Sequence, residues 1–141
     1  MIDLTKILAV GQNAIVRKVV QKSNTAGNYN CAMNELLATP ACIEMVINAA
    51  VETVDKYLPE GFISVGCSVE FSHTAPTSLG MTINVKTTIA EIEDNHITMD
   101  IQAWDEMGEI GVGRHVRAIV NRDAALKKAK QRTQFLVRRS L

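Results

Sequence analysis

The residues best suited to chemistry lie at two places in the sequence. His73 lies in a polar segment, residues 72–80, that follows a strand-like run, and Thr39 precedes Pro40 at the start of a helix-like run. Imidazole titrates near neutral pH, so His73 can act as a general base or a nucleophile. The hydroxyl of Thr39 can orient a substrate or a water. These residue types predict acid–base chemistry, provided that the fold brings the two places together.

The run that leads to His73 has the period of a β-strand. Small or polar residues alternate with an apolar set, which consists of Ile63, Val65, Cys67, Val69 and Phe71. Successive side chains of a strand point to opposite faces, so His73 continues the apolar face. We therefore expect its imidazole to point toward the core side of a sheet where the strand ends. Gly66, inside the run, either relieves crowding in a strongly curved sheet or leaves room that an acyl group can occupy.

The run that follows Thr39 predicts a helix from Pro40 to about Leu58, where Pro59-Glu60-Gly61 ends it. Threonine is a good N-cap and proline suits the first helical position. Apolar side chains cover nearly the whole circumference, which predicts a buried helix. The exceptions are spaced by four and form one polar stripe: Glu44, Asn48 and Glu52.

The first turn of this helix is a candidate site for a developing negative charge. Amides there have no intrahelical partner, and Ala41 and Cys42 keep the N–H that Pro40 lacks. Asn48 is a candidate for orienting a water or the substrate. We therefore predict Gly66, Ala41, Cys42 and Asn48 as substrate-binding residues.

The rest of the chain predicts an antiparallel sheet. Strands are expected at about 14–20, 62–72, 81–92, 96–104 and 109–121, with hairpin turns at Asp94-Asn95 and Met107-Gly108. A last helix follows Asn121-Arg122-Asp123. This order indicates an α+β fold in which a curved sheet wraps around a long central helix. We expect one domain, 1–141, with a core at about 8–121 and a C-terminal helix at about 122–138.

Composition excludes several classes of protein. The 15 basic and 15 acidic residues cancel, which argues against a nucleic-acid or membrane partner, and no run approaches the roughly 20 apolar residues of a membrane span. The three cysteines lack metal-ligand spacing, so no metal site is expected. Cys42 and Cys67 lie in apolar runs, as reduced core thiols do. Together with the absence of a signal-type N-terminus, this favours a cytoplasmic protein.

Four fragments resemble the fluoroacetyl-CoA thioesterase-like family of the hot-dog fold. They span roughly residues 35–121 and are Thr39-Pro40-Ala41, Val65-Gly66, Ser72-His73 with Gly80-Met81, and Gly113-Arg114-His115-Val116-Arg117. The resemblance implies an acyl-CoA ligand, no cofactor beyond that coenzyme A, and a site at the interface of a homodimer or a dimer of dimers. The family's catalytic set is a threonine, a glutamate and a histidine. Thr39 and His73 match it, whereas the glutamate position falls on Ile47.

Two functions follow from this pattern. One is an acyl-CoA thioesterase that hydrolyses a small or medium acyl group with Thr39 and His73. The other is a non-hydrolytic hot-dog module that binds acyl-CoA or another small ligand, which Ile47 favours. The phosphates of coenzyme A have three candidate partners: Arg114, Arg117 and the basic tail that begins at Lys127.

Overall fold

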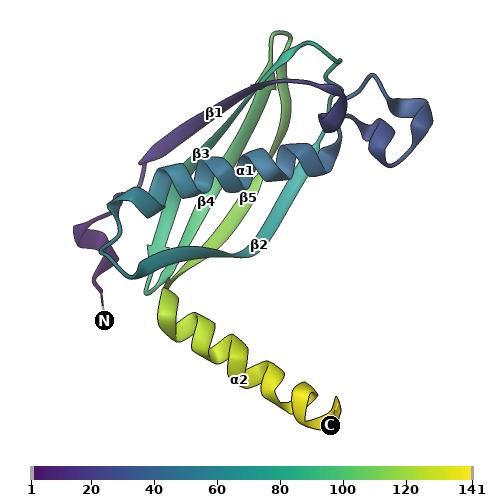
Figure 1. The fold of residues 1–141 in the computed structure, drawn as a ribbon. Coiled ribbons are helices and arrows are strands. Elements are labelled where there is room, and N and C mark those ends of the chain that lie inside the picture. Colours follow the sequence, from purple (N-terminus) through teal and green to yellow (C-terminus); the bar gives the residue numbers. More distant parts are fainter. Residues whose placement is uncertain (1, 141) are drawn as a thin grey trace.

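The computed structural model describes residues 2–140, and the side chains of residues 137–140 are outside the description. A five-stranded antiparallel sheet curves around one long helix (Figure 1). The strand order is β1-β3-β4-β5-β2, so β1 and β2 are the edges. The elements are β1 (Asn13–Val19), α1 (Thr39–Val54), β2 (Phe62–His73), β3 (Thr82–Glu93), β4 (His96–Asp105), β5 (Gly108–Asn121) and α2 (Arg122–Ser140).

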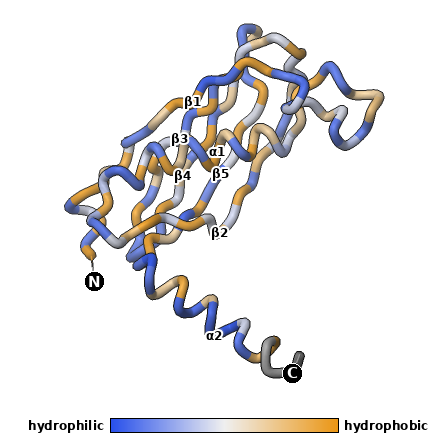
Figure 2. Tube along the Cα trace, in the orientation of Figure 1, coloured by the Kyte–Doolittle hydropathy of each residue, from blue (hydrophilic) through white to orange (hydrophobic). Residues whose placement is uncertain are grey.

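The five predicted strands and both hairpins are confirmed, with bounds that differ by one residue at most positions. Their turns use residues that tolerate a left-handed backbone: φ is 53° at Asp94 and 122° at Gly108. The predicted cap of the last helix is also confirmed, because the Asn121 side chain accepts a hydrogen bond from the Ala124 amide at 2.9 Å. Figure 2 shows hydropathy alternating along the strands, whereas α2 is largely hydrophilic.

The core lies between α1 and the concave face of the sheet. It takes alternate residues of β3 and β4 and one face of the helix: Ile83, Val85, Ile89, Ile97, Met99, Ile101, Met45, Val46, Ala49 and Ala50 are all buried. Burying one large apolar side chain stabilises the fold by about 1.5–3 kcal/mol. The strand residues expected to face the helix therefore do so, and this packing fixes α1 across the sheet.

The prediction that α1 is buried all round is wrong for the chain as described. Ile47 is 40 % exposed and Val51 is 37 % exposed, on the same side as the polar stripe that begins at Glu44. The sheet covers only one side of the helix, so the remaining apolar side chains face outward. The helix also ends earlier than predicted, at Val54, with a single 3₁₀ turn over Asp55–Tyr57.

The prediction of one apolar face along β2 is wrong in its first half. The β2–β5 register shifts between Gly66 and Ser68, which makes Cys67 the extra residue of a β-bulge. A bulge exchanges the two faces. Val69, Phe71 and His73 point to the concave side, as expected, but before the bulge Ser64 and Gly66 take that side. Cys67 is accordingly exposed, not a core thiol, whereas Cys42 is buried as predicted.

The predicted cap at Thr39 is also wrong. Ala38 has the extended backbone of an N-cap (φ −79°, ψ 142°), and α1 has no side-chain cap hydrogen bond. Thr39 is the first helical residue and Pro40 the second, where proline still removes no needed donor. The hydroxyl of Thr39 is therefore not used by the helix terminus.

Candidate active site

Backbone hydrogen bonds from three segments place Thr39 beside the end of β2. The Leu37 amide donates to the Thr77 carbonyl and the Ala38 amide to the Asn24 carbonyl, both at 2.8 Å. These bonds hold the chain that enters α1. On the other side, His73 pairs with Gly111 of β5, and the next amide, Thr74, donates to the Ile110 carbonyl at 2.8 Å. The helix start and the strand end are thus fixed by the same framework.

The structure brings together the two residues predicted to be catalytic. Thr39 Oγ1 lies 2.8 Å from His73 Nδ1, a hydrogen-bond distance between groups 34 residues apart in sequence. His73 Nε2 is buried and has no hydrogen-bond partner among the described residues. An unpaired buried polar atom is costly, and such atoms recur where a substrate or catalytic partner completes a site. Thr39 itself is exposed, so its hydroxyl is the accessible member of the pair.

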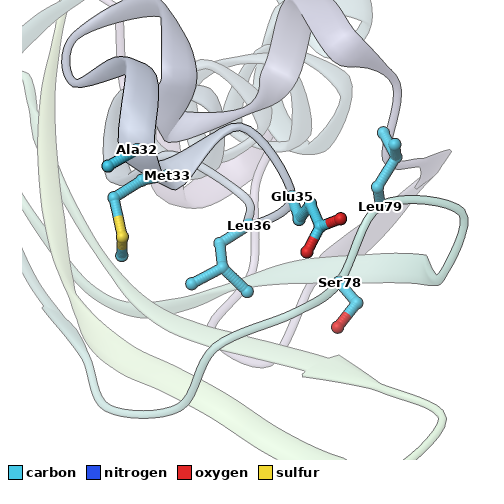
Figure 3. Close-up of a pocket in the computed structure, with 6 residues that line it drawn as sticks. All are labelled: Ala32, Met33, Glu35, Leu36, Ser78 and Leu79. Carbon is cyan, nitrogen blue, oxygen red and sulfur yellow. The ribbon is translucent and has the colours of Figure 1, made fainter.

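A pocket of about 310 Å³ opens beside this pair. Its lining is Ala26, Met33, Leu36, Leu37, Thr39, His73, Thr74, Ala75 and Pro76. Met33 and Leu36 also line a second pocket of about 420 Å³, with Ala32, Glu35, Ser78 and Leu79. Figure 3 shows Leu36 between Met33 on one side and Glu35 and Ser78 on the other. Met33 and Leu36 thus border both the pocket at the Thr39–His73 pair and the second pocket.

The other predicted site residues are not in this pocket. The expectation that the Ala41 and Cys42 amides lack an intrahelical partner is wrong, because both donate to the carbonyl of the N-cap residue Ala38, at 3.1 and 3.4 Å. Asn48 is exposed on α1, nine residues from Thr39 and therefore about 13 Å along the helix. Gly66 is seven strand residues from His73, roughly 20 Å away. Their substrate-binding roles stay predictions.

A buried polar network, which the sequence did not indicate as a unit, lies on the concave face at the opposite end of β2. Arg117 donates to the Ser64 hydroxyl at 2.8 Å and to the Ser64 carbonyl at 2.9 Å, while Asp55 accepts from the Ser64 hydroxyl and amide. A third nitrogen of Arg117 lies 3.1 Å from His115 Nε2. These contacts connect the end of α1 to both strands.

His115 is neutral in this network. Its Nδ1 lies 2.8 Å from the Ser68 carbonyl, which can only accept, so Nδ1 carries the proton and Nε2 accepts from Arg117. Burial, and secondarily the Arg117 charge, lower the pKa of His115 despite its hydrogen bond to Ser68. Burial also raises the pKa of the Cys42 thiol to about 11, so Cys42 is not a nucleophile here.

Within residues 2–140, no three or more His, Cys, Asp or Glu side chains are grouped as metal ligands. None of the described helices is long and apolar enough to cross a membrane.

Comparison with known proteins matches this fold and these motifs. The sequence model of the fluoroacetyl-CoA-specific thioesterase family matches residues 20–123. The fluoroacetyl-CoA thioesterase of Streptantibioticus cattleyicolor is 30 % identical over 99 residues, which are 70 % of this chain and 71 % of that protein.

Solved structures agree. A hot-dog-like protein from Thermanaerovibrio acidaminovorans superposes with a TM-score of 0.89 at 32 % identity, over 93 % of this chain and 97 % of that one. A fluoroacetyl-CoA thioesterase variant in complex with acetyl-CoA superposes with a TM-score of 0.81 at 26 % identity, over 89 % of this chain and 99 % of that one. The fold is therefore the hot-dog fold, and the chain belongs to the fluoroacetyl-CoA-specific thioesterase family.

Proposed function

We propose that the protein is an acyl-CoA thioesterase in which His73 is the general base and the Thr39 hydroxyl the nucleophile. The family supplies the reaction class, acyl-CoA thioester hydrolysis. The observation that carries the assignment of residues is the 2.8 Å contact between Thr39 Oγ1 and His73 Nδ1. A hydroxyl within hydrogen-bond reach of a base is the arrangement that nucleophilic catalysis requires. The substrate class is a small or medium acyl-CoA, and the adjoining pocket of about 310 Å³ offers room for such an acyl group.

The chemistry balances with these two residues, coenzyme A and one water. Thr39 Oγ1 attacks the thioester carbonyl while its proton passes to His73 Nδ1. The tetrahedral intermediate expels the thiolate, which takes that proton and leaves as free coenzyme A. The same nitrogen then removes a proton from water, which attacks the acyl–threonine ester, and returns that proton to the Thr39 oxygen as the ester C–O bond breaks and the carboxylic acid leaves. No cofactor is needed beyond the coenzyme A of the substrate.

The site is completed, in this proposal, by a second copy that pairs with the edge of β2. An unpaired strand edge is a site for pairing with another chain, and the exposed Ile47 and Val51 form an apolar face beside the sheet for the partner to cover. Antiparallel pairing about a two-fold axis near Val69 and Glu70 puts His73 of one copy opposite Gly66 of the other. Gly66 then borders the acyl group although it is distant within its own chain. Sedimentation equilibrium should show a dimer at micromolar concentration, and a stable monomer would contradict this pairing.

The assignment of residues is tested by a single-turnover experiment on acetyl-CoA. Intact-mass measurement of quenched samples should show an acetyl adduct that maps to Thr39, absent in Thr39→Ala. If the Thr39→Val variant turns over acetyl-CoA as fast as the wild type, Thr39 is not the nucleophile. Direct attack of water on the thioester, without an acyl-enzyme, would then replace this mechanism.

The alternative, a non-hydrolytic module that binds acyl-CoA, rests on Ile47. The side chain at that position has no proton to move and lies about 12 Å along α1 from Thr39. Binding of acyl-CoA with no turnover for any acyl group tested would establish this alternative. A cytoplasmic location also stays a prediction.

A further inference from the structure

The chain is neutral as a whole, but its basic residues are concentrated in α2. Seven of the 15 basic residues and one of the 15 acidic residues lie between Arg122 and Leu141. Four of these basic side chains, Lys127, Lys128, Lys130 and Arg132, are exposed and form no ion pair with another described residue. Lys128 and Arg132 are four residues apart and share a face of the helix. These four side chains are therefore cations without an anionic partner among residues 2–136.

The other two candidates for the coenzyme A phosphates are already engaged. Arg114 Nε lies 3.3 Å from Asp100 Oδ1 in a surface ion pair. Arg117 is buried, and its hydrogen bonds go to Ser64 and His115. Of the three cation sources that the sequence offered, only the basic tail has described cations, from Lys127 to Arg132, that are exposed and outside the ion pairs.

The position of α2 decides which site it can serve. The helix follows Asn121, which pairs with Phe62, whereas His73 pairs with Gly111 at the opposite end of the same two strands. The 12 residues of β2 span about 40 Å, so α2 begins far from the His73 of its own chain. Figure 1 shows that α2 leaves the body on the side of β2, away from β1. A second copy paired antiparallel along β2 has its His73 end on that side.

We propose that α2 of one subunit binds the phosphate groups of the coenzyme A whose thioester lies at the Thr39–His73 pair of the other subunit. The inference rests on the proposed function and names a binding element for its substrate. The diphosphate and 3′-phosphate are the anionic end of the ligand, and exposed Lys and Arg side chains complement them. A helix that lies on an anionic membrane needs a wide apolar face with large side chains. Among the described side chains of α2, the exposed large apolar residues are Leu126, Phe135 and Leu136, which do not make up such a face.

The test separates the two ends of the substrate. The variant Lys128→Glu/Arg132→Glu is compared with Lys6→Glu/Lys18→Glu, two exposed lysines elsewhere that give the same change in net charge. Each is assayed with acetyl-CoA and with acetyl-pantetheine, which lacks the nucleotide. The α2 variant should raise KM for acetyl-CoA at least tenfold, with kcat within twofold and KM for acetyl-pantetheine unchanged. The control should change neither. Added salt should raise KM for acetyl-CoA in the wild type and have little effect in the α2 variant.

A mixed dimer tests whether the helix acts on the other subunit. One chain carries His73→Ala with wild-type α2, and its partner carries an intact His73 with Lys128→Glu/Arg132→Glu. The single working pocket should keep the wild-type KM, since its phosphates meet the unchanged helix. A KM as high as that of the α2 variant would show that the helix serves its own chain and overturn the proposal.

The remaining outcomes are also decisive. Equal KM values for acetyl-CoA in the wild type and the α2 variant overturn the proposal, as does charge-dependent binding of α2 to phosphatidylserine vesicles with no change in KM. Absence of turnover with both thioesters would contradict the proposed function but not this inference. In that case, calorimetric titration measures the affinity of the wild type and the α2 variant for coenzyme A and for pantetheine. If the α2 variant loses affinity for coenzyme A but not for pantetheine, the result supports the binding of the phosphates by α2.

Discussion

Replacing Thr39 by alanine should remove catalysis with almost no effect on stability. Had Thr39 been the N-cap of α1, the change would cost about 0.5–2 kcal/mol of folding free energy. Its hydroxyl instead contacts His73, and the N-cap is Ala38. The variant loses one hydrogen bond at an exposed residue, worth about 0.5–1.5 kcal/mol at most, and gains up to about 0.5 kcal/mol of helix propensity. The net change in the free energy of unfolding should stay within about 1 kcal/mol.

The effect on rate should be much larger. Loss of the nucleophile should lower kcat/KM for acetyl-CoA at least about a hundredfold, which corresponds to about 2.7 kcal/mol of transition-state stabilisation. Thr39→Ser keeps the hydroxyl and should retain most activity, so it is the matched control. Urea unfolding and thiol-release kinetics on the same samples measure both quantities. A variant destabilised by more than 1.5 kcal/mol, or one with more than a tenth of the wild-type rate, would refute the separation of the two roles.

Three further predictions concern the surroundings of the site. The pKa of His115 is lowered in the folded protein, so the unfolded state binds more protons and the free energy of unfolding should fall as pH drops below about 6.5. Urea titrations at pH 7.5 and 5.5 measure this loss of stability. An equal loss in a His115→Gln variant would show that another group causes it. Ile47→Glu should leave each subunit folded, since the position is 40 % exposed, but should weaken the proposed dimer, because it puts a charge on the apolar face that the partner covers; sedimentation equilibrium tests this, and an unchanged dimer would show that Ile47 is not at the interface. Gly113→Ala should destabilise the protein by several kcal/mol, because the added methyl would collide with the Glu70 carbonyl. Gly66→Ala should keep wild-type stability, because its methyl meets nothing nearer than 3.6 Å. Thermal unfolding of the two variants tests this contrast.

The strands, hairpins and central helix could be predicted because local patterns determine them. Alternation, turn residues and the Asn121 cap each act over a few residues, and the structure agrees with them. The order of the family fragments predicted the hot-dog fold and the pairing of Thr39 with His73, which no local pattern gives.

The errors arise where a local pattern is compatible with two structures. A bulge at Cys67 changes the face of every earlier residue in β2, but one inserted residue leaves no mark in an alternating sequence. Threonine before proline suits both an N-cap and the first helical position, and the backbone at Ala38 decided between them. The apolar residues around α1 indicate burial but do not show which of them the sheet covers, and the outward position of Ile47 and Val51 depends on the sheet.

The central claim is that the contact between His73 and Thr39 drives thioester hydrolysis. It is tested most directly by steady-state hydrolysis of a panel of acyl-CoA thioesters by the wild type and by His73→Ala, with urea unfolding as the control for folding. The account predicts turnover of at least one small or medium acyl-CoA, and a loss of about a hundredfold or more in a folded His73→Ala variant. Equal rates for the two proteins, or no turnover of any thioester by the wild type, would contradict it.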